Sequence, residues 1–336
     1  MLEANPIAQP HLSLGAALYE QRRLAEARQA FGDALASQPD LSPAKFNLGV
    51  ICRELEENEA AESYFREVIA AGEILPESYN NLGILASRRE SDDEAMENYR
   101  QAIRLRYQFP LAHFNLATLL LRLGQWQEGW QEYEWRWQTP TFTPIDCPQP
   151  KWDGGNLDGT LLLHTEQGIG DVFQFARFIP MIRERCRRVM FVRPEALEGM
   201  FSGDSWGDEV RSPGTFSLDS FDAFLPLMSA PHVLNISAEN LPCGESYLTP
   251  AARQVDLGTP PVANAKLKVG ITWCGSPTHS NDAFRSTRVD SFLPLFEIPD
   301  VAYYSLQIAD AANDLDKLGP HGCVVRDLSG VQRDFA

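Results

Sequence analysis

Residues 161–177 bring together residue types that could bind a polar ligand and act on it. The apolar run beginning at Leu161 is followed by Gly168 and Gly170 and then by an amphipathic run, which predicts a strand, a tight turn and a helix. Glycines let the backbone approach a ligand closely, and the free N–H groups at a helix start favour anionic or strongly polar groups. Asp171 stands at this helix start, where its carboxylate could act as a general base or serve only as a helix cap.

A second stretch has the same order. Residues 267–274 form an apolar run that predicts a buried strand, and a polar loop from Gly275 to Ser286 follows it. Further strands are expected over residues 189–192, 221–227, 301–306 and 323–326, with a loop over 201–220 and a helix over 289–296. Strands that alternate with helices predict doubly wound parallel sheets in two Rossmann-like units, which bind ligands at the carboxyl ends of their strands.

The N-terminal part of the chain holds an internal repeat with a period of about 34 residues. Three columns recur in register: a leucine followed by a small residue, then a second small residue, then an aromatic ring. The columns are Leu14-Gly15, Leu48-Gly49, Leu82-Gly83 and Leu116-Ala117; Ala27, Ala61, Ala95 and Gly129; and Phe31, Phe65, Tyr99 and Tyr133. Small residues are expected where two helices cross closely, and the ring fills the gap against the next repeat. Residues 8–140 therefore resemble the tetratricopeptide family and predict an α-solenoid of three full repeats and a modified fourth.

The fourth repeat departs from the pattern by carrying Trp126, Trp130, Trp135 and Trp137 close together. This aromatic cluster could face a substrate, or it could be the cap by which the last repeat docks onto the following domain. We favour the cap, because a terminal repeat must cover its open face. The concave groove of such an array is expected to take a peptide or protein, although so few repeats could also serve as a spacer or a dimer contact.

Charge and composition narrow the classes of function. The chain of 336 residues has a formal net charge of −17 and no basic run, which argues against nucleic-acid binding. The 6 cysteines are far apart and lack metal-ligand spacing, so we expect reduced thiols and no metal site. The N-terminus lacks the features of a signal peptide, and no stretch approaches the roughly 20 apolar residues of a membrane span. We therefore expect a cytoplasmic protein with no membrane span.

Proline, glycine and aspartate are concentrated in two stretches, which predicts the domain boundaries. We expect the repeats over residues 8–140, a linker over 141–156, a Rossmann-like domain over 157–255, a second linker over 256–266, and a partial second Rossmann-like domain over 267–336.

Several motifs together resemble a specific family. They are Glu166-Gln-Gly-Ile-Gly-Asp171 with Gln174-Phe-Ala-Arg177, the run from Gly270 to Ser286, Ser305-Leu-Gln307, and Tyr133-Glu-Trp-Arg-Trp137. With the repeats, they look like bacterial tetratricopeptide-repeat glycosyltransferases, whose catalytic half is similar to family 9, the heptosyltransferases, and whose layout is similar to that of the O-linked N-acetylglucosamine transferases. The resemblance implies a GT-B fold that transfers a sugar from a nucleotide-sugar donor to a hydroxyl of a protein or glycan. It implies no metal and no other cofactor.

The resemblance also implies roles for individual residues. Asp171 would be the general base that takes the proton of the acceptor hydroxyl. Substrate-binding residues would be Glu166, Gln167, Gly168, Gly170 and Gln174. The donor phosphates would be held by Gly275, Ser276, His279, Arg285 and Ser286, because N–H donors and fixed positive charge stabilise a leaving diphosphate. Simpler roles are a helix cap for Asp171, a surface ion pair for Arg285, a loop histidine for His279 and a solvated carboxylate for Glu166.

One departure from the family affects the donor side. The family continues past Asp327-Leu-Ser329 into further strands and a helix, whereas this chain ends at Ala336 and its second unit is short for a Rossmann-like domain. We therefore expect an incomplete donor-binding domain with little activity alone. The alternative is a tetratricopeptide-repeat interaction scaffold whose α/β part is a non-catalytic remnant.

Overall fold

The computed structural model describes most of the chain. The described residues are 6–142, 146–166, 168–198, 200–201, 206–243, 247–248, 257–275, 282, 286–307, 314–318 and 325–329. Their contacts divide the chain into two compact units. The first unit is Met1–Asp158 with Asp222–Cys243, and the second is Gly159–Phe221 with Gly244–Ala336.

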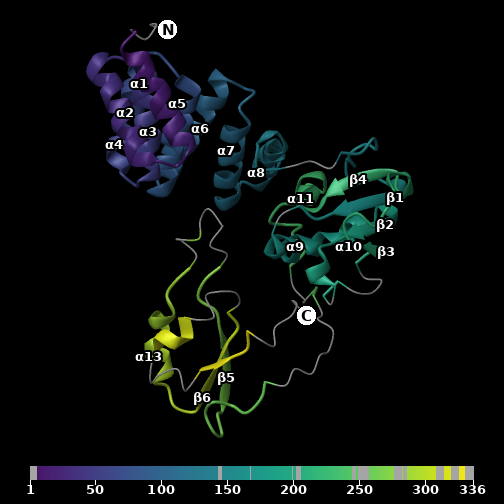
Figure 1. Cartoon of the computed structure of the whole chain (residues 1–336). Helices are drawn as coiled ribbons and strands as arrows, with labels where there is room; N and C mark the ends of the chain where they lie inside the picture. The colour runs from purple at the N-terminus through teal and green to yellow at the C-terminus, as the bar shows by residue number, and fades with distance from the viewer. Residues whose placement is uncertain are drawn as a thin grey trace. The chain divides into compact units, whose positions relative to one another are not determined.

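Residues 6–142 of the first unit form a row of eight α-helices (Figure 1). The helices are α1 (Ala8–Glu20), α2 (Leu24–Ser37), α3 (Ser42–Glu54), α4 (Asn58–Ala70), α5 (Leu75–Arg88), α6 (Asp92–Leu105), α7 (Pro110–Arg122) and α8 (Trp126–Tyr133), followed by the 3-10 helix η1 (Glu134–Gln138). Each odd-numbered helix packs on the helix that follows it. The odd-numbered helices also contact one another, α1 with α3, α3 with α5 and α5 with α7. We call these four helices the first-helix layer.

The repeated small residues lie where a side chain would collide with a ring. A Cβ atom added at Gly15 would lie 2.7 Å from Phe31 Cε1, and one added at Gly49 would lie 2.8 Å from Phe65 Cε1. The fourth repeat closes differently, because a Cβ at Gly129 would lie 2.8 Å from Leu121 Cδ2. Close packing of two helices therefore explains two of the three columns in the sequence.

The turn inside each repeat also recurs. Arg22, Glu56, Glu90 and Gly124 occupy the same place in successive repeats and have φ angles of 61°, 63°, 60° and 76°. A left-handed residue ends the first helix and lets the chain reverse. A proline in the first turn begins α3, α5 and α7, where its missing N–H would have had no helical partner.

The first α/β sheet follows the repeats. Its strands are β1 (Leu157–His164), β2 (Cys186–Val192), β3 (Glu209–Arg211) and β4 (Ala223–Pro226), in the order β3-β2-β1-β4, and β2 pairs with β3 in parallel. The helices in this part of the chain are α9 (Ile169–Phe175), η2 (Ala176–Phe178), α10 (Ile179–Arg183), η3 (Glu195–Leu197), η4 (Leu218–Ser220), η5 (Leu227–Ser229) and α11 (Ala230–Val233). The prediction of a loop over residues 201–220 was wrong at residues 209–211, which form β3. That strand is only three residues long and begins and ends with a charged residue, so it shows no apolar alternation.

A second sheet of three parallel strands lies in the second unit. It runs β5 (Leu267–Ile271), β6 (Val301–Ser305) and β7 (Val325–Asp327) in that order. Between β5 and β6 come η6 (Val289–Phe292) and α13 (Leu293–Phe296), where the sequence predicts one helix. Ile271, Trp273, Phe296 and Tyr303 belong to its buried apolar cluster. The expectation of an α/β region with parallel sheets is thereby confirmed.

Among the residues that the structure describes, none of the helices combines the length and the apolar composition that crossing a membrane requires.

Candidate functional site

Three asparagines occupy the same place on successive helices of the first-helix layer. Asn47 on α3 donates its side-chain N–H to Pro43 O at 2.8 Å, and Asn81 on α5 donates to Glu77 O at 2.9 Å. Asn115 is the matching residue on α7. The side-chain oxygen of Asn81 is buried and accepts no hydrogen bond within the described part of the chain. An unsatisfied buried acceptor costs free energy.

Polar contacts join neighbouring members of the first-helix layer. Asn115 on α7 donates to Asn80 Oδ1 on α5 at 2.9 Å. At the other end of the array, the hydroxyl of Tyr19 on α1 donates to Glu54 on α3, which also receives Arg22 Nη1 at 2.8 Å. Burial and the Glu54 carboxylate raise the pKa of Tyr19 to about 12. The layer therefore carries a polar seam of amides and charges.

The asparagine column was missed in the sequence. Asn47, Asn81 and Asn115 recur at the repeat period, as the glycine and ring columns do. Those two columns were found by looking for the small residues and rings that close helix packing requires. That criterion does not pick out a column of polar residues. A search for polar residues at the same period would have found it.

A charged network around the buried Arg136 joins the last repeat to residues 222–243 in the first unit. Arg136 in η1 is fully buried, and its guanidinium donates to Glu134 Oε1 and to Ser229 Oγ, both at 2.8 Å. Lys151 pairs with the other oxygen of Glu134 and donates to Ser229 Oγ at 3.3 Å. Burial acts to raise the pKa of the Glu134 carboxyl, but Arg136 and Lys151 outweigh it and hold that pKa below its ordinary value.

Aromatic rings complete this junction. Trp135 stacks on His113 of α7, with ring centroids 3.9 Å apart and planes within 5°. The Arg136 guanidinium lies over Trp137 at 4.2 Å and over Tyr133 at 4.7 Å from the ring centroids. Because Trp135 and Trp137 pack on the last repeat and its buried arginine, the structure favours the cap interpretation for both.

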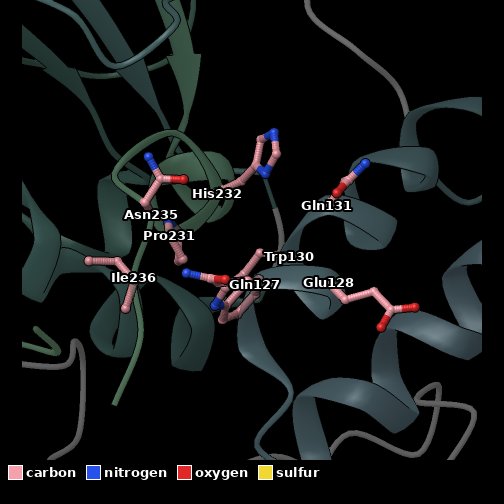
Figure 2. A pocket seen from close by; sticks show the side chains of 8 residues that line it. All are labelled: Gln127, Glu128, Trp130, Gln131, Pro231, His232, Asn235 and Ile236. Carbon is pink, nitrogen blue, oxygen red and sulfur yellow. The ribbon is translucent and has the colours of Figure 1, made fainter. Parts of the chain in front are cut away.

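Trp130 lies instead at a pocket of about 410 Å³ between α8 and the segment that begins in α11 (Figure 2). The lining residues are Gln127, Glu128, Trp130, Gln131, Pro231, His232, Asn235 and Ile236. An indole with amides around it can hold a small polar molecule. The one carboxylate of this lining, Glu128, is already paired with Arg100 Nη2 at 2.9 Å.

The turn after β1 contains most of the predicted substrate-binding residues. Asp171 Oδ2 accepts the backbone N–H of Gly168 at 3.1 Å, so the carboxylate closes the first turn of α9 as a cap does. Gly168, Gly170 and Gln174 are exposed, whereas Glu166 and Asp171 are half-buried. The structure thus brings Gly168 and Asp171 together at the carboxyl end of β1. Gln167 lies outside the described residues.

The turn after β5 is organised by two side chains. Gln307, which follows β6, accepts the backbone N–H groups of Trp273 and Cys274 at 3.0 and 3.1 Å and donates to Cys274 O at 3.1 Å. Ser286 Oγ accepts the backbone N–H of Gly275 at 3.0 Å, so these two predicted donor-side residues do lie together. The predicted residues Ser276, His279 and Arg285 lie outside the described part of the chain.

Comparison with known protein families decides the character of the repeats. Residues 12–73 match the model described as tetratricopeptide repeat, and residues 88–124 match the model described as TPR repeat. The N-terminal region is a tetratricopeptide-repeat array. The prediction of these repeats from three columns is therefore confirmed.

Among curated proteins, the chain is similar to protein FlbA of Caulobacter vibrioides. The two are 26% identical over 225 residues, which is 58% of this chain and 37% of FlbA. The chain therefore spans well under half the length of this relative. The matched share of the chain is larger than residues 8–140 could supply, so the similarity is not confined to the tetratricopeptide-repeat array.

Several solved structures match part of the chain. Pseudomonas aeruginosa pilF is 23% identical, with a TM-score of 0.36, and the match covers 41% of this chain and 63% of that one. A MamA structure from Desulfovibrio magneticus RS-1 is 19% identical, with a TM-score of 0.35, over 38% of this chain and 72% of that one. YrrB, titled a TPR protein with an unusual peptide-binding site, is 19% identical, with a TM-score of 0.35, over 40% of this chain and 69% of its own.

Proposed function

We propose that the tetratricopeptide-repeat array binds an extended segment of a partner protein along its first-helix layer. The observation that carries this proposal is the recurrence of Asn47, Asn81 and Asn115 at one place on α3, α5 and α7. A side-chain amide offers both a donor and an acceptor, so it can bond a peptide backbone whatever side chains that peptide carries. In this proposal the Asn81 side chain turns its oxygen, which is buried and without a partner among the described residues, toward a peptide N–H.

A spacer or dimer role explains these residues less well. A spacer needs the packing columns of glycine and ring. Asn115 also joins α7 to Asn80 on α5, whereas the amides of Asn47 and Asn81 donate within their own helices, which a spacer does not require. Asparagine has below-average helix propensity in a helix interior, so three asparagines in register are better explained by a further role. Binding to a peptide backbone supplies that role.

Peptide binding can be tested with an array of immobilised short peptides of varied sequence and the labelled full chain. We expect Asn81→Ala to weaken binding of the selected peptides by up to about ten-fold, the worth of one or two hydrogen bonds. Asn98→Ala is the matched control, because Asn98 donates to Glu94 O at 2.9 Å in the same way but lies on the second helix α6. Equal loss in both variants, or no selected peptide at all, would remove the proposal.

Glycosyl transfer is the second candidate, and the turn after β1 favours it. Ligands of parallel α/β sheets bind at the carboxyl ends of the strands, and Gly168 and Asp171 lie at that end of β1. The strand order β3-β2-β1-β4 is the order found at the centre of doubly wound dinucleotide-binding sheets. The resemblance of these motifs to family 9 glycosyltransferases supplies the reaction class.

In this proposal each predicted residue has one role in the transfer of the sugar. Asp171 takes the proton from the acceptor hydroxyl. At the same time the oxygen of that hydroxyl forms a bond to the anomeric carbon of the sugar. The bond from that carbon to the donor phosphate oxygen breaks, and the nucleoside diphosphate leaves. Arg285 and Ser286, with the backbone N–H groups of the loop after β5, balance the charge that develops on the diphosphate.

Calorimetric titration of the full-length gene product with nucleotides and nucleotide sugars tests this second candidate. We expect Asp171→Asn to abolish turnover while donor binding stays unchanged, because a base acts on the acceptor and not on the donor. Asp158→Asn, in β1 before the turn, serves as the control and should retain turnover. Absence of any nucleotide binding would remove the glycosyltransferase candidate and leave the peptide-binding proposal standing.

A further inference from the structure

One side of α1 is apolar and exposed at the N-terminal end of the tetratricopeptide-repeat array. Leu14 is 52% exposed, and Ile7, which directly precedes the helix, is 66% exposed. Pro10 and Ala17 are exposed as well. These residues are three or four positions apart, so they line up along one side of the helix. We call Ile7, Pro10, Leu14 and Ala17 the α1 strip.

The matching residues of the next three repeats are buried or half-buried. They are Leu41, Ala44, Leu48 and Ile51 at α3; Leu75, Ser78, Leu82 and Leu85 at α5; and Phe109, Ala112, Leu116 and Leu119 at α7. Leu48 and Leu82 are each 4% exposed, and Leu116 is 2% exposed. A single exposed leucine is ordinary on a protein surface. A strip whose counterparts are covered in every later repeat is instead typical of an interface.

The second helix of the preceding repeat provides this cover in the later repeats. α2 packs on α3, α4 packs on α5 and α6 packs on α7. Leu48 shares a buried cluster with Ala34 of α2, and Leu82 shares one with Ala61 and Phe65 of α4. The partner that fits this place is therefore a helix with an uncharged face of small and apolar side chains.

The second helices of the array are already engaged. α2, α4 and α6 each pack between two first helices, and α8 contacts both α7 and α11. The C-terminal end of the array is thus covered by a segment of this chain. A terminal repeat of a solenoid normally carries a polar outer face, and the α1 strip lacks one. A helix from another molecule is the partner that remains for it.

Charge narrows the choice of that molecule. The chain has a net charge of −17, so two copies repel each other wherever acidic surfaces meet. α1, however, contains no Asp, Glu, Lys or Arg before Glu20. The α1 strip is therefore a place where two copies can meet without bringing like charges together, and it offers the small and apolar side chains that the partner helix requires.

We propose that the α1 strip is the contact between two copies of this chain, packed strip against strip around a two-fold axis. Each copy then supplies the same surface, so both strips are covered at once and association stops at the dimer. This inference goes beyond peptide binding and does not depend on it, because the asparagine column lies on α3, α5 and α7.

The size of the α1 strip determines the strength of the dimer. α1 has 13 residues and is therefore about 20 Å long, and a helix is about 10 Å wide. A strip of this size is smaller than the roughly 800 Å² that each partner buries in an interface of standard size. We therefore expect a reversible dimer that dissociates on dilution through the micromolar range.

Sedimentation velocity of the full chain from about 1 to about 200 μM tests the proposal, and the average mass should rise from monomer to dimer. Leu14→Glu should weaken association at least about ten-fold, because Leu14 lies near the middle of the α1 strip and two like charges would then meet close to the axis. Leu111→Glu is the matched control. Leu111 is 47% exposed on α7, and α5 carries Glu77 at the same place, so this variant should associate as the unaltered chain does.

A mixture of two variants tests the two-fold pairing itself. Leu14→Glu and Leu14→Lys should each be monomeric alone and should form dimers when mixed, because opposite charges then face each other near the axis. Far-UV circular dichroism shows that each variant folds. The proposal is overturned if the chain stays monomeric over the whole range, if Leu14→Glu weakens association no more than Leu111→Glu does, or if the mixture remains monomeric.

Discussion

In the tetratricopeptide repeats, a glycine of one helix packs directly against an aromatic ring of the next helix. Gly49 has no room for a methyl group, since a Cβ there would lie 2.8 Å from Cε1 and 3.0 Å from Cζ of Phe65. Phe65 is fully buried and cannot move aside without disturbing its neighbours. Gly32, on α2, has no atom within 4 Å of the corresponding position. The two glycines therefore differ in steric role although both lie within helices.

This difference predicts opposite effects of one substitution. Gly49→Ala should destabilise the chain by about 1–3 kcal/mol, because overpacking outweighs the gain in helix propensity. Gly32→Ala should stabilise it by up to about 1 kcal/mol, because only the propensity changes. Urea unfolding followed by far-UV circular dichroism measures both free energies of unfolding. Equal effects at the two positions would show that the ring contact does not limit the packing of the repeat.

Helices and strands could be predicted from the sequence where the residues that pack together form a recognisable local pattern. The helices of the tetratricopeptide-repeat array follow from columns such as Gly15 with Phe31, and β6 follows from its apolar run at Val301–Ser305. β3 was missed because a three-residue strand owes its existence to pairing with β2 and not to its own residues.

The candidate sites show the same limit at the level of elements. The glycine turns after β1 and β5 could be located, and Gly168 with Asp171 and Gly275 with Ser286 do lie together. That Gln307 clamps the turn after β5 from a distant part of the chain could not be derived, since its three bonds to residues 273–274 depend on the parallel pairing of β5 with β6.

At the scale of the whole molecule, contacts between residues far apart in sequence determine which segments belong to the first unit. Residues 222–243, which the expected boundaries place within 157–255, are grouped with the tetratricopeptide-repeat array. The bond from Arg136 to Ser229 is one such contact, and Arg136 is fully buried. A buried arginine is tolerated only when its charge is met, and here Glu134 meets it. The charge of the Glu134 carboxylate therefore contributes to the docking of the two segments.

This dependence predicts how the stability of the chain changes with pH. The pKa of Glu134 is lowered in the folded protein, so its contribution is fully present above the ordinary glutamate pKa and is lost as the pH falls through the lower folded value. Glu134→Gln should therefore cost about 3 kcal/mol at pH 7, because it removes the negative charge of Glu134 from beside the buried Arg136 guanidinium. The difference from the unaltered chain should shrink once the pH falls below about 4.

Urea unfolding of both chains across this pH range measures that difference. Subtracting one free energy from the other removes the effects of the remaining carboxylates, which both chains share. Glu97→Gln is the matched control, because Glu97 pairs with Arg104 at the exposed surface and should cost no more than about 1 kcal/mol at any pH. A Glu134→Gln difference that is the same at pH 7 and at pH 3 would mean that the network holds the two segments by shape alone, without its charge.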